Sequence, residues 1–315
     1  MKILVTGAAG FIGSNLSKAL IRRNDDVVLV DDLTWGLPSN LGELASFLNV
    51  ISINDFDSLM KVCVDIEVGI IVHLAARGSV PRSIAEPLET HQVNATGTLN
   101  VVEVARRTGA RVIFSSSSSV YGANAALPKS ETMWTSPLSP YAASKLAGEG
   151  YCAAYAESYD IPTTVFRFFN IFGPWQRPDH DYAAVIPRWI WAALNDQPIF
   201  LDGDGTQTRD FTYVDDVVAT IVSAIDGEVN HPQPINLAFG NRISLLEVIA
   251  ELERIVGRKI KVETRPRRAA DVPHSQNDPT LLKSVFPEIE PVPFAQALEK
   301  TVEWMRTNGP ADKSH

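Results

Sequence analysis

A tyrosine and a lysine four residues apart, Tyr141 and Lys145, stand in the segment SPYAASK that begins at Ser139. On a helix, residues at this spacing share one face, so the phenol and the ammonium group can act together. A free tyrosine has a pKa of about 10, but nearby positive charge favours its phenolate. A phenolate present near neutral pH can remove the proton of a hydroxyl group. We therefore predict that Tyr141 is a catalytic base.

A glycine-rich segment, GAAGFIG, begins at Gly7 and lies between an apolar run and a segment with helical spacing. Glycines allow a tight turn and the close approach of a diphosphate, which N–H groups at a helix N-terminus can bind. Asp31 ends the second apolar run, eighteen residues after Gly13. A carboxylate at that position accepts the ribose hydroxyls of NAD and repels the 2′-phosphate of NADP. The pattern predicts a dinucleotide site that prefers NAD.

The elements that must position these residues follow from the order of apolar and helical segments. We expect buried strands at 2–6, 27–30, 69–74, 111–115 and 163–168, and helices at 11–23, 55–64 and 84–107. Strand and helix therefore alternate through the first half of the chain. This order predicts a doubly wound parallel α/β sheet with helices on both faces.

The pattern loosens after residue 159. Prolines and aromatic residues are interspersed over 173–198, a composition typical of loops, and loops held on a scaffold often bind ligands. Further elements are expected as a helix at 214–225, a strand at 235–238 and an amphipathic helix at 244–256. Ser244 and Glu247, three residues apart, predict a capping box at the start of the last helix.

Composition excludes several classes of function. The chain has 28 basic and 37 acidic residues and a formal net charge of −9, so it lacks long-range attraction for nucleic acid or anionic membranes. No stretch reaches the roughly 20 apolar residues of a membrane span. Cys63 and Cys152 form no CxxC pair, and His73 has no partner ligands in sequence, so we expect no metal. A soluble cytoplasmic protein is expected.

Motifs along nearly the whole chain resemble the extended short-chain dehydrogenase/reductase superfamily, and more narrowly its NAD-dependent UDP-hexose and UDP-N-acetylhexosamine 4-epimerases. The likeness rests on VTGAAGFIGSNL, HLAARGSVPRSI, NATGTLNVVE, FSSSSSVYG, SPYAASK, RFFNIFGP, YAAVIPRWI, GDGTQTRDFTYVDD and DVPHSQND. So many matches in the same order make a chance likeness implausible. The resemblance implies a Rossmann-type sheet, bound NAD, and a UDP-sugar that is oxidised and reduced again at C4.

The resemblance also implies a set of cofactor-binding residues. Gly7, Gly10 and Gly13 match the positions that hold the NAD diphosphate, and Asp31 matches the position that binds the adenosine ribose. The other matching positions are Phe11, Ile12 and Ile53, then Ala75 and Ala76 beneath the cofactor, Asn94 near its nicotinamide half, Tyr141 and Lys145. Ser52 stands where relatives often carry an aspartate beside the adenine, so the adenine contacts are expected to differ.

By the same resemblance, Ser117, Tyr141 and Lys145 form the catalytic group, and Ser117 also contacts the substrate. The positions that hold UDP match Asn170, Arg209, Arg268 and Asp271. The family's RPGD segment reads RAAD here, which alters that turn. The residue four after the aspartate faces the sugar C2 substituent in the family, and here it is Ser275. Its small side chain implies a pocket that admits UDP-N-acetylglucosamine and UDP-N-acetylgalactosamine as well as UDP-glucose.

Pattern and resemblance together predict two domains and a dimer. Residues 1–169 are expected to form the NAD-binding Rossmann domain, to which a helix and strand at about 211–240 return. Residues 170–315 are expected to form the smaller, loop-rich UDP-sugar-binding domain. The helix that begins at Tyr141 carries small residues, namely Ala142, Ala143, Ala147, Gly148, Ala153, Ala154 and Ala156. Relatives pair this helix and the one near 84–107 across a two-fold axis, so a homodimer is expected.

Three other functions compete with C4 inversion. A nucleotide-sugar 4,6-dehydratase has Asp-Glu directly after the catalytic hydroxyl, where this chain has Ser118 and Ser119, which are neither acid nor base at neutral pH. A UDP-glucuronate 4-epimerase or decarboxylase shares the QRPD segment at 176–179, but many glucuronate epimerases have threonine in place of Asn170. A non-catalytic NAD-binding regulatory protein should have lost part of the catalytic group, which is complete here.

Overall fold

The structure, a computed structural model, describes residues 1–179, 183–266 and 273–309. The chain divides into two compact units. The first comprises 1–125, 131–168 and 218–236, and the second comprises 126–130, 169–217 and 237–315. The helix α9 (Val214–Asp226) runs from the second unit into the first.

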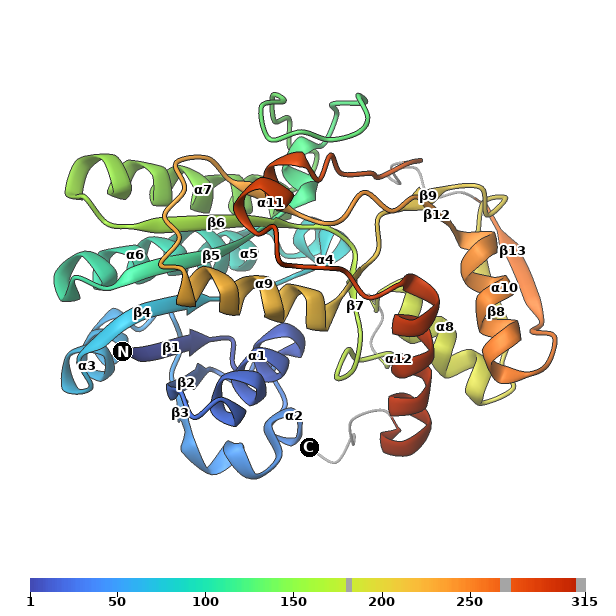
Figure 1. Cartoon of the computed structure of the whole chain (residues 1–315), viewed down its shortest axis with the longest axis horizontal. Helices are drawn as coiled ribbons and strands as arrows, with labels where there is room; N and C mark the ends of the chain where they lie inside the picture. The colour runs from blue at the N-terminus through green and yellow to red at the C-terminus, as the bar shows by residue number, and fades with distance from the viewer. Residues whose placement is uncertain (180–182, 267–272, 310–315) are drawn as a thin grey trace. The chain divides into compact units, whose positions relative to one another are not determined.

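One seven-stranded sheet forms the centre of the first unit (Figure 1). Its strands are, in spatial order, β11 (Ile235–Leu237), β6 (Thr163–Phe168), β5 (Arg111–Ser117), β4 (Val68–His73), β1 (Lys2–Thr6), β2 (Asp26–Asp31) and β3 (Leu48–Val50). Neighbouring strands from β6 to β3 pair in parallel, which confirms the predicted Rossmann-type sheet. The strand order changes direction between β1 and β4, and ligands of such sheets bind at that switch point, outside the carboxyl ends of the strands.

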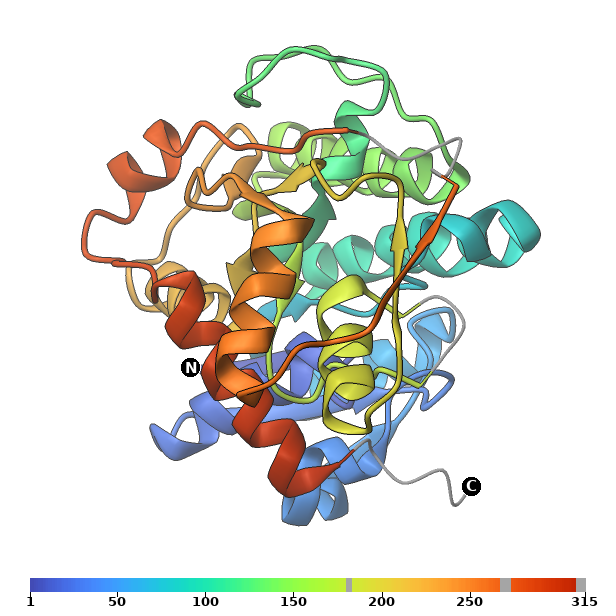
Figure 2. The same cartoon turned by 90° about the vertical axis from the view of Figure 1, so that its right-hand side faces the viewer.

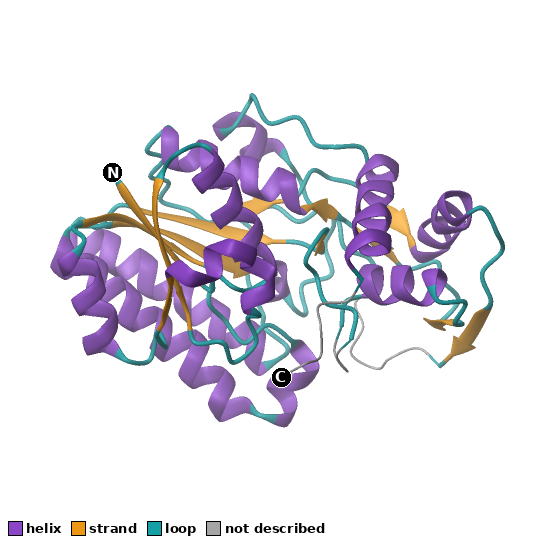
Figure 3. Cartoon of the chain, turned by 90° about the horizontal axis from the view of Figure 1, so that it is seen from below, coloured by secondary structure: helices purple, strands orange, loops and turns teal. Residues whose placement is uncertain are grey.

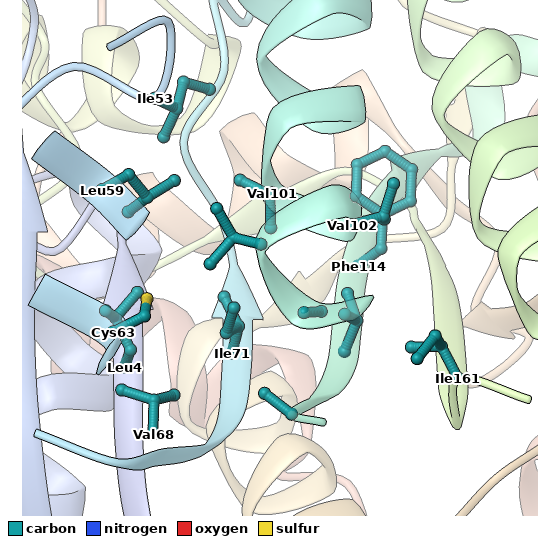
Figure 4. Close-up of a cluster of buried hydrophobic side chains, with 14 of the residues drawn as sticks. Leu4, Ile53, Leu59, Cys63, Val68, Ile71, Val101, Val102, Phe114 and Ile161 are labelled. Carbon is teal, nitrogen blue, oxygen red and sulfur yellow. The ribbon is translucent and has the colours of Figure 1, made fainter. Parts of the chain in front are cut away.

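Helices cover both faces of this sheet (Figure 3). One face is covered by α3 (Phe56–Asp65), α6 (Gly97–Thr108) and α7 (Pro140–Tyr159), and α1 (Phe11–Arg22) lies on the other. Leu4, Ile71 and Phe114, from three neighbouring strands, are fully buried in one cluster with Leu59 and Val101 of the helices (Figure 4). A parallel sheet that is apolar on both faces needs such cover, which is why the strands read as continuous apolar runs.

The strand β5 continues two residues beyond the expected end at Ser115. The side chain of Ser115 donates to the carbonyl oxygen of His73 at 3.0 Å, and Ser116 is also buried and hydrogen-bonded. Serine reads as a polar break in an apolar run. Here, however, each hydroxyl has a partner, so the strand carries these residues into the interior and ends at Ser117.

The continuous helical segment expected over 84–107 is interrupted. The structure has α4 (Val80–Ala85), α5 (Pro87–His91), a π-helical turn (Gln92–Thr96) and then α6. Glu86 separates the first two with φ −132° and ψ 65°, because a residue that precedes proline is pushed out of the helical region. The π turn places Asn94 inside the unit, and such turns occur frequently at functional sites.

The described residues of the second unit form three short strand pairs and four helices. The pairs are β7 (Ile171–Phe172) with β10 (Thr212–Tyr213), β9 (Thr208–Arg209) with β12 (Ile243–Ser244), and β8 (Ile199–Asp202) with β13 (Val262–Arg265). The helices are α8 (Val185–Leu194), α10 (Leu245–Val256), α11 (Thr280–Val285) and α12 (Phe294–Asn308). Figure 2 shows α8 in yellow, α10 in orange and α12 in red. The capping box at Ser244 is confirmed.

Two sequence expectations need correction in this unit. The helix α8 lies inside the stretch 173–198 that its prolines and aromatic residues marked as loop. Pro187 is tolerated because it occupies the first turn, where a backbone N–H has no helical partner. Helix α12 was not expected at all. Within the described part of the chain, none of the helices is both long and apolar enough to cross a membrane.

Candidate active site

The glycine-rich loop after β1 is shaped by contacts that exclude side chains. Gly7 has φ +69°, and a β-carbon there would lie 2.7 Å from the backbone nitrogen of Ala75. A β-carbon on Gly13 would lie 2.0 Å from the carbonyl oxygen of Gly7. Gly10 precedes α1 without capping it through a side chain, so the positive end of that helix is open to an anion. This is the cradle that a dinucleotide diphosphate requires.

Asp31 lies beside this loop, as the sequence predicts for a ribose-binding carboxylate. Its Oδ2 accepts a hydrogen bond from the backbone N–H of Ala9 at 3.0 Å, and its Oδ1 accepts one from Leu33 at 2.8 Å. Burial raises the pKa of Asp31, and the two backbone hydrogen bonds act in the opposite direction. Gly36 faces the carboxylate so closely that a β-carbon there would lie 2.6 Å from Oδ1. The residues present therefore fit NAD.

The remaining predicted cofactor residues have different surroundings. Phe11 and Ile12 begin α1, and Ala75 follows β4, where its N–H donates to the hydroxyl of Thr6 at 3.3 Å. Ala76 is the next residue and is partly exposed. The side chain of Ile53, in contrast, is 3% exposed and belongs to the apolar core (Figure 4). The side chain of Ile53 is therefore not exposed to a cofactor.

Asn94 ties the loop after β4 to α7. Its side-chain oxygen accepts from the backbone N–H of Arg77 at 2.8 Å, and its amide donates to the hydroxyl of Ser144 at 3.0 Å. The residue is 1% exposed. In this structure Asn94 therefore holds the segment that contains Ala75 and Ala76 against the helix that carries Tyr141.

The structure brings the predicted catalytic side chains together. Ser139 caps α7 by accepting from the N–H of Ala142 at 3.1 Å, which places Tyr141 in the first helical turn. The side chain of Ser117 lies close enough to the Tyr141 phenol to act on its pKa, which it lowers. Ser119, which the sequence did not mark, donates from its hydroxyl to the Oγ of Ser117 at 2.9 Å. Ser117 is thus held by Ser119 and lies beside Tyr141.

Lys145 lies one turn further along α7 and is 3% exposed. Its Nζ donates to the carbonyl oxygen of Ser115 at 2.7 Å. Burial lowers the pKa of Lys145 to about 7, while Cys152 and Glu149 act in the opposite direction. A lysine with such a pKa is charged in only part of the population near neutral pH.

For Tyr141 the outcome differs from the simplest reading of the sequence. Burial raises its pKa, and the hydrogen bond from Ser117 opposes this only in part. The protein alone therefore does not make Tyr141 a phenolate at neutral pH. The positive charge that the nicotinamide ring of oxidised NAD carries is the further influence that would favour the phenolate.

His73 is a buried structural residue, as expected. Its Nδ1 lies 2.8 Å from the hydroxyl of Thr6 and its Nε2 lies 3.0 Å from that of Thr98. Burial and, to a smaller extent, the charge of Lys145 lower its pKa to about 3. Among the described residues, no group of histidine, cysteine and acidic side chains is arranged to hold a metal ion. Cys63 and Cys152 are free thiols and buried.

In the second unit, three of the residues predicted to bind the substrate lie on adjoining segments. The amide of Asn170 donates to the carbonyl oxygen of Asp210 at 3.2 Å. The guanidinium of Arg209 donates to the carbonyl oxygen of Pro273 at 3.2 Å. The backbone N–H of Ser275 donates to the carbonyl oxygen of Thr208 at 3.0 Å. Arg268 and Asp271 lie outside the described residues.

Asp210 fixes this group and was missed by sequence reasoning. Its carboxylate is fully buried and accepts backbone hydrogen bonds from Gly240 at 3.0 Å, Asn241 at 3.1 Å and Asn277 at 2.9 Å. Burial raises its pKa to about 7 despite these bonds. One side chain thus joins the strand that carries Arg209 to the segment that follows Ser275.

Residues 3–238 match the model of the NAD-dependent epimerase/dehydratase family. The chain belongs to this family. As a member of the epimerase/dehydratase family it is an NAD-dependent enzyme, in agreement with the glycine cradle and with Asp31. The match covers the Rossmann sheet from Ile3 onward and includes segments of the second unit.

Individual proteins extend the likeness over almost the full chain. A UDP-glucose 4-epimerase of Mycolicibacterium smegmatis is 37% identical over 97% of this chain and 99% of its own length. A UDP-glucuronate 4-epimerase of Thermodesulfobacterium geofontis is 33% identical, with coverage of 97% and 96%.

Solved structures agree. The UDP-glucose 4-epimerase of Thermotoga maritima with UDP-glucose has a TM-score of 0.92 and 33% identity, covering 98% of this chain and 99% of the other. The UDP-N-acetylglucosamine 4-epimerase of Methanobrevibacter ruminantium, in complex with UDP-N-acetylmuramic acid, has a TM-score of 0.90 and 34% identity, with coverage of 97% and 98%. The relatives share the fold but act on different UDP-sugars.

Proposed function

We propose that this enzyme inverts C4 of a UDP-sugar through a 4-keto intermediate. We further propose that its substrates are UDP-N-acetylglucosamine and UDP-N-acetylgalactosamine, together with UDP-glucose and UDP-galactose. The observation that carries the proposal is the proximity of the Ser117 and Tyr141 side chains, with buried Lys145 one turn further along the helix. The relatives named above include 4-epimerases of glucose and of N-acetylglucosamine nucleotides, which supports the reaction class.

The roles of the side chains follow from their contacts. Tyr141 takes the proton of the sugar O4 hydroxyl when C4 is oxidised and returns it when C4 is reduced. Ser117, held between Tyr141 and Ser119, positions O4 by hydrogen bonding. The charge on Lys145 stabilises the tyrosine phenolate. NAD, when bound, supplies the acceptor and donor of hydride, and reduction on the opposite face of the ketone inverts the carbon.

The second unit supplies the residues that we assign to the nucleotide and the sugar. Asn170 and Arg209, held in place around Asp210, are assigned to UDP, as are Arg268 and Asp271. Ser275 is assigned to the sugar C2 substituent. Its backbone is fixed to β9 and its side chain is small, which leaves room for an N-acetyl group.

UDP-glucuronate is the competing substrate, because Arg177 belongs to a segment that glucuronate relatives share. Two N–H groups of Arg177 donate to the carboxylate of Asp179, each at 3.0 Å. This pairing compensates the charge of Arg177 locally instead of offering it to a sugar carboxylate. The geometry therefore favours neutral sugars.

Separate incubations test the proposal. The purified protein is mixed with UDP-N-acetylglucosamine, UDP-glucose or UDP-glucuronate, and the products are resolved by chromatography. We expect the C4 epimers of the first two sugars. Formation of UDP-galacturonate alone would assign the competing function, and no epimer from any sugar would reject both.

We also propose that the enzyme is a cytoplasmic homodimer. Ile84 and Leu88, on α4 and α5, are 60% and 84% exposed, and the neighbouring helix α7 exposes Ala143, Ala153 and Ala154. An apolar surface rich in small residues suits helix packing across a two-fold axis. Both cysteines are free thiols, in keeping with a reducing compartment. Light scattering at micromolar concentration should give twice the mass of one chain, and the mass of one chain would reject the dimer.

A further inference from the structure

A buried ion pair lies within the first unit, next to the segments that carry the catalytic side chains. Arg167 of β6 donates from Nε and Nη2 to the two carboxylate oxygens of Glu149 on α7, at 2.9 and 2.7 Å. The side chains are 6% and 7% exposed. By comparison, the ion pair of Lys61 and Asp65 lies on the surface.

The pair is the centre of a longer network. The hydroxyl of Ser116 donates to Glu149 at 2.5 Å. The hydroxyl of Tyr121 accepts from Nη1 of Arg167 at 2.9 Å and donates to the side-chain oxygen of Asn236 at 2.7 Å. All five side chains are buried. Each of these contacts lies between residues of the same compact unit.

Members of the network adjoin each segment that carries a catalytic group. Ser116 is bonded directly to Ser117 in β5. Tyr121 ends the 3-10 turn (Ser118–Tyr121) that begins immediately after Ser117. Glu149 stands four residues after Lys145 on α7, so the two share one face of that helix. The Arg167 guanidinium thus fastens the turn and the helix to β6, and the strand joins the network through the contact of Ser116 with Glu149.

Stability alone gives no reason for charged groups at this place. Removing two charges from water costs about as much as their attraction returns, so apolar residues of similar volume would serve a core equally well. A bidentate pair, however, fixes direction as well as distance. Directional contacts are what a catalytic group needs, since a displacement of about 1 Å can cost about 10²-fold in rate.

We propose that Glu149 and Arg167 are positioning residues, which set the geometry of Ser117, Tyr141 and Lys145 through contacts with the segments that carry them. The kinetic tests of this proposal rest on the function proposed above, and the spectroscopic test does not. Glu149 also contributes negative charge near Lys145. The other titratable groups around that ammonium are Tyr141, His73 and Cys152.

A double variant separates positioning from stability. In Glu149→Gln with Arg167→Met both charges are removed, so neither is left buried without its partner. We expect thermal unfolding close to that of the wild type, but kcat for the UDP-sugar at least about 10-fold lower with KM changed less than about twofold. The alkaline limb of the kcat profile should move to lower pH, because the ammonium of Lys145 loses a neighbouring negative charge. Glu303→Gln, which removes an exposed carboxylate on α12, is the matched control and should change none of these.

Wild-type kcat and an unchanged pH profile in the double variant would overturn the proposal. If that variant does not fold, Tyr121→Phe decides, because it removes one hydroxyl from the network and keeps the ring. A kcat about threefold lower at unchanged KM supports positioning, and wild-type kcat overturns it.

A spectroscopic readout needs no substrate and separates this proposal from the proposed function. The phenolate of Tyr141 is titrated by ultraviolet difference spectroscopy in the NAD-loaded protein, with Tyr141→Phe as the blank. We expect the midpoint of the Tyr141 titration to lie at higher pH in the variant than in the wild type. The variant is Glu149→Gln with Arg167→Met, or Tyr121→Phe if the double variant does not fold. Equal midpoints would overturn the proposal even if the wild type epimerises UDP-sugars, and a shifted midpoint would support it even if no sugar were turned over.

Discussion

The Nζ of Lys145 lies 2.7 Å from the carbonyl oxygen of Ser115. That carbonyl belongs to β5, two residues before Ser117, so Lys145 fastens its own helix to the strand that carries Ser117. Tyr141, one turn earlier on the helix, is thereby kept beside Ser117. The catalytic group is therefore one connected structure, although its members come from two elements.

Replacing Tyr141 tests the base in this group. Tyr141→Phe should fold and retain NAD, because the substitution keeps the ring and removes only the hydroxyl that lies beside Ser117. Turnover should fall by a factor of about 10² or more, the usual scale for a lost general base. Tyr159→Phe, at the exposed end of the same helix, serves as the control and should keep wild-type turnover. Near-normal activity of Tyr141→Phe would remove this residue from the mechanism.

Cofactor choice depends on Asp31. The protein should purify with NAD and bind NADP weakly, because the carboxylate repels a 2′-phosphate. Asp31→Ala should lower the affinity for NAD and reduce the ratio of the NAD affinity to the NADP affinity. Titration of the variant with each dinucleotide measures both affinities. Asp32→Asn, the exposed neighbour, should leave both affinities unchanged. Equal affinity of the wild-type protein for the two cofactors would contradict the assignment.

Much of this site could be predicted from the sequence because its signals are local. Glycines before a helix, an acidic residue at a strand end, and a tyrosine and lysine one turn apart lie within short segments. The strands were also predictable, since a sheet covered on both faces needs unbroken apolar runs. β1 and β6 have the expected ends, and the ends of β2, β4, β5 and β11 differ from the expected ones by one or two residues. β3 and the short strands of the second unit were not predicted.

The parts that sequence reasoning missed depend on distant residues. Glu149 and Arg167 read as ordinary charged residues until α7 and β6 are brought side by side. Asp210 looks like part of a polar strand end, and only the fold shows the three backbone N–H groups that its carboxylate gathers. Pro87, in turn, breaks a helix whose side-chain periodicity continues across it, because periodicity does not report backbone restriction.

The buried histidine predicts how stability depends on pH. The folded pKa of His73 is about 3, below the value of about 6.5 in an unfolded chain. Above pH 6.5 His73 is neutral in both the folded and the unfolded state, so it does not change the free energy of unfolding. As the pH falls below 6.5 the unfolded chain takes up a proton that the folded state excludes, and the free energy of unfolding decreases.

Urea unfolding at pH 7 and pH 5 measures this loss. His73 should account for about 2 kcal/mol of the difference in unfolding free energy between the two pH values. In His73→Gln that part of the pH dependence should disappear, whatever the stability of the variant at pH 7. The carboxylates contribute the same pH dependence of the unfolding free energy to the wild type and to His73→Gln, so their contribution cancels in the comparison. Identical pH dependence in the two proteins would contradict a neutral His73.

Substrate breadth is predicted to depend on Ser275. Ser275→Tyr should lose activity on UDP-N-acetylglucosamine and keep part of its activity on UDP-glucose, because filling the pocket rejects the larger substituent by steric clash. Ser284→Tyr, on the exposed face of α11, is the control and should change neither activity. A Ser275→Tyr variant that handles both sugars as the wild type does would remove Ser275 from the pocket.

The fate of the hydrogen at C4 tests the central claim most directly. UDP-N-acetylglucosamine that carries deuterium at C4 is incubated with the enzyme, and the product is examined by mass spectrometry and NMR. Inversion through a 4-keto intermediate predicts UDP-N-acetylgalactosamine with the deuterium still at C4, because the same hydride is removed and returned. Transfer of the label to C6, its loss to solvent, or the absence of the C4 epimer would contradict the account.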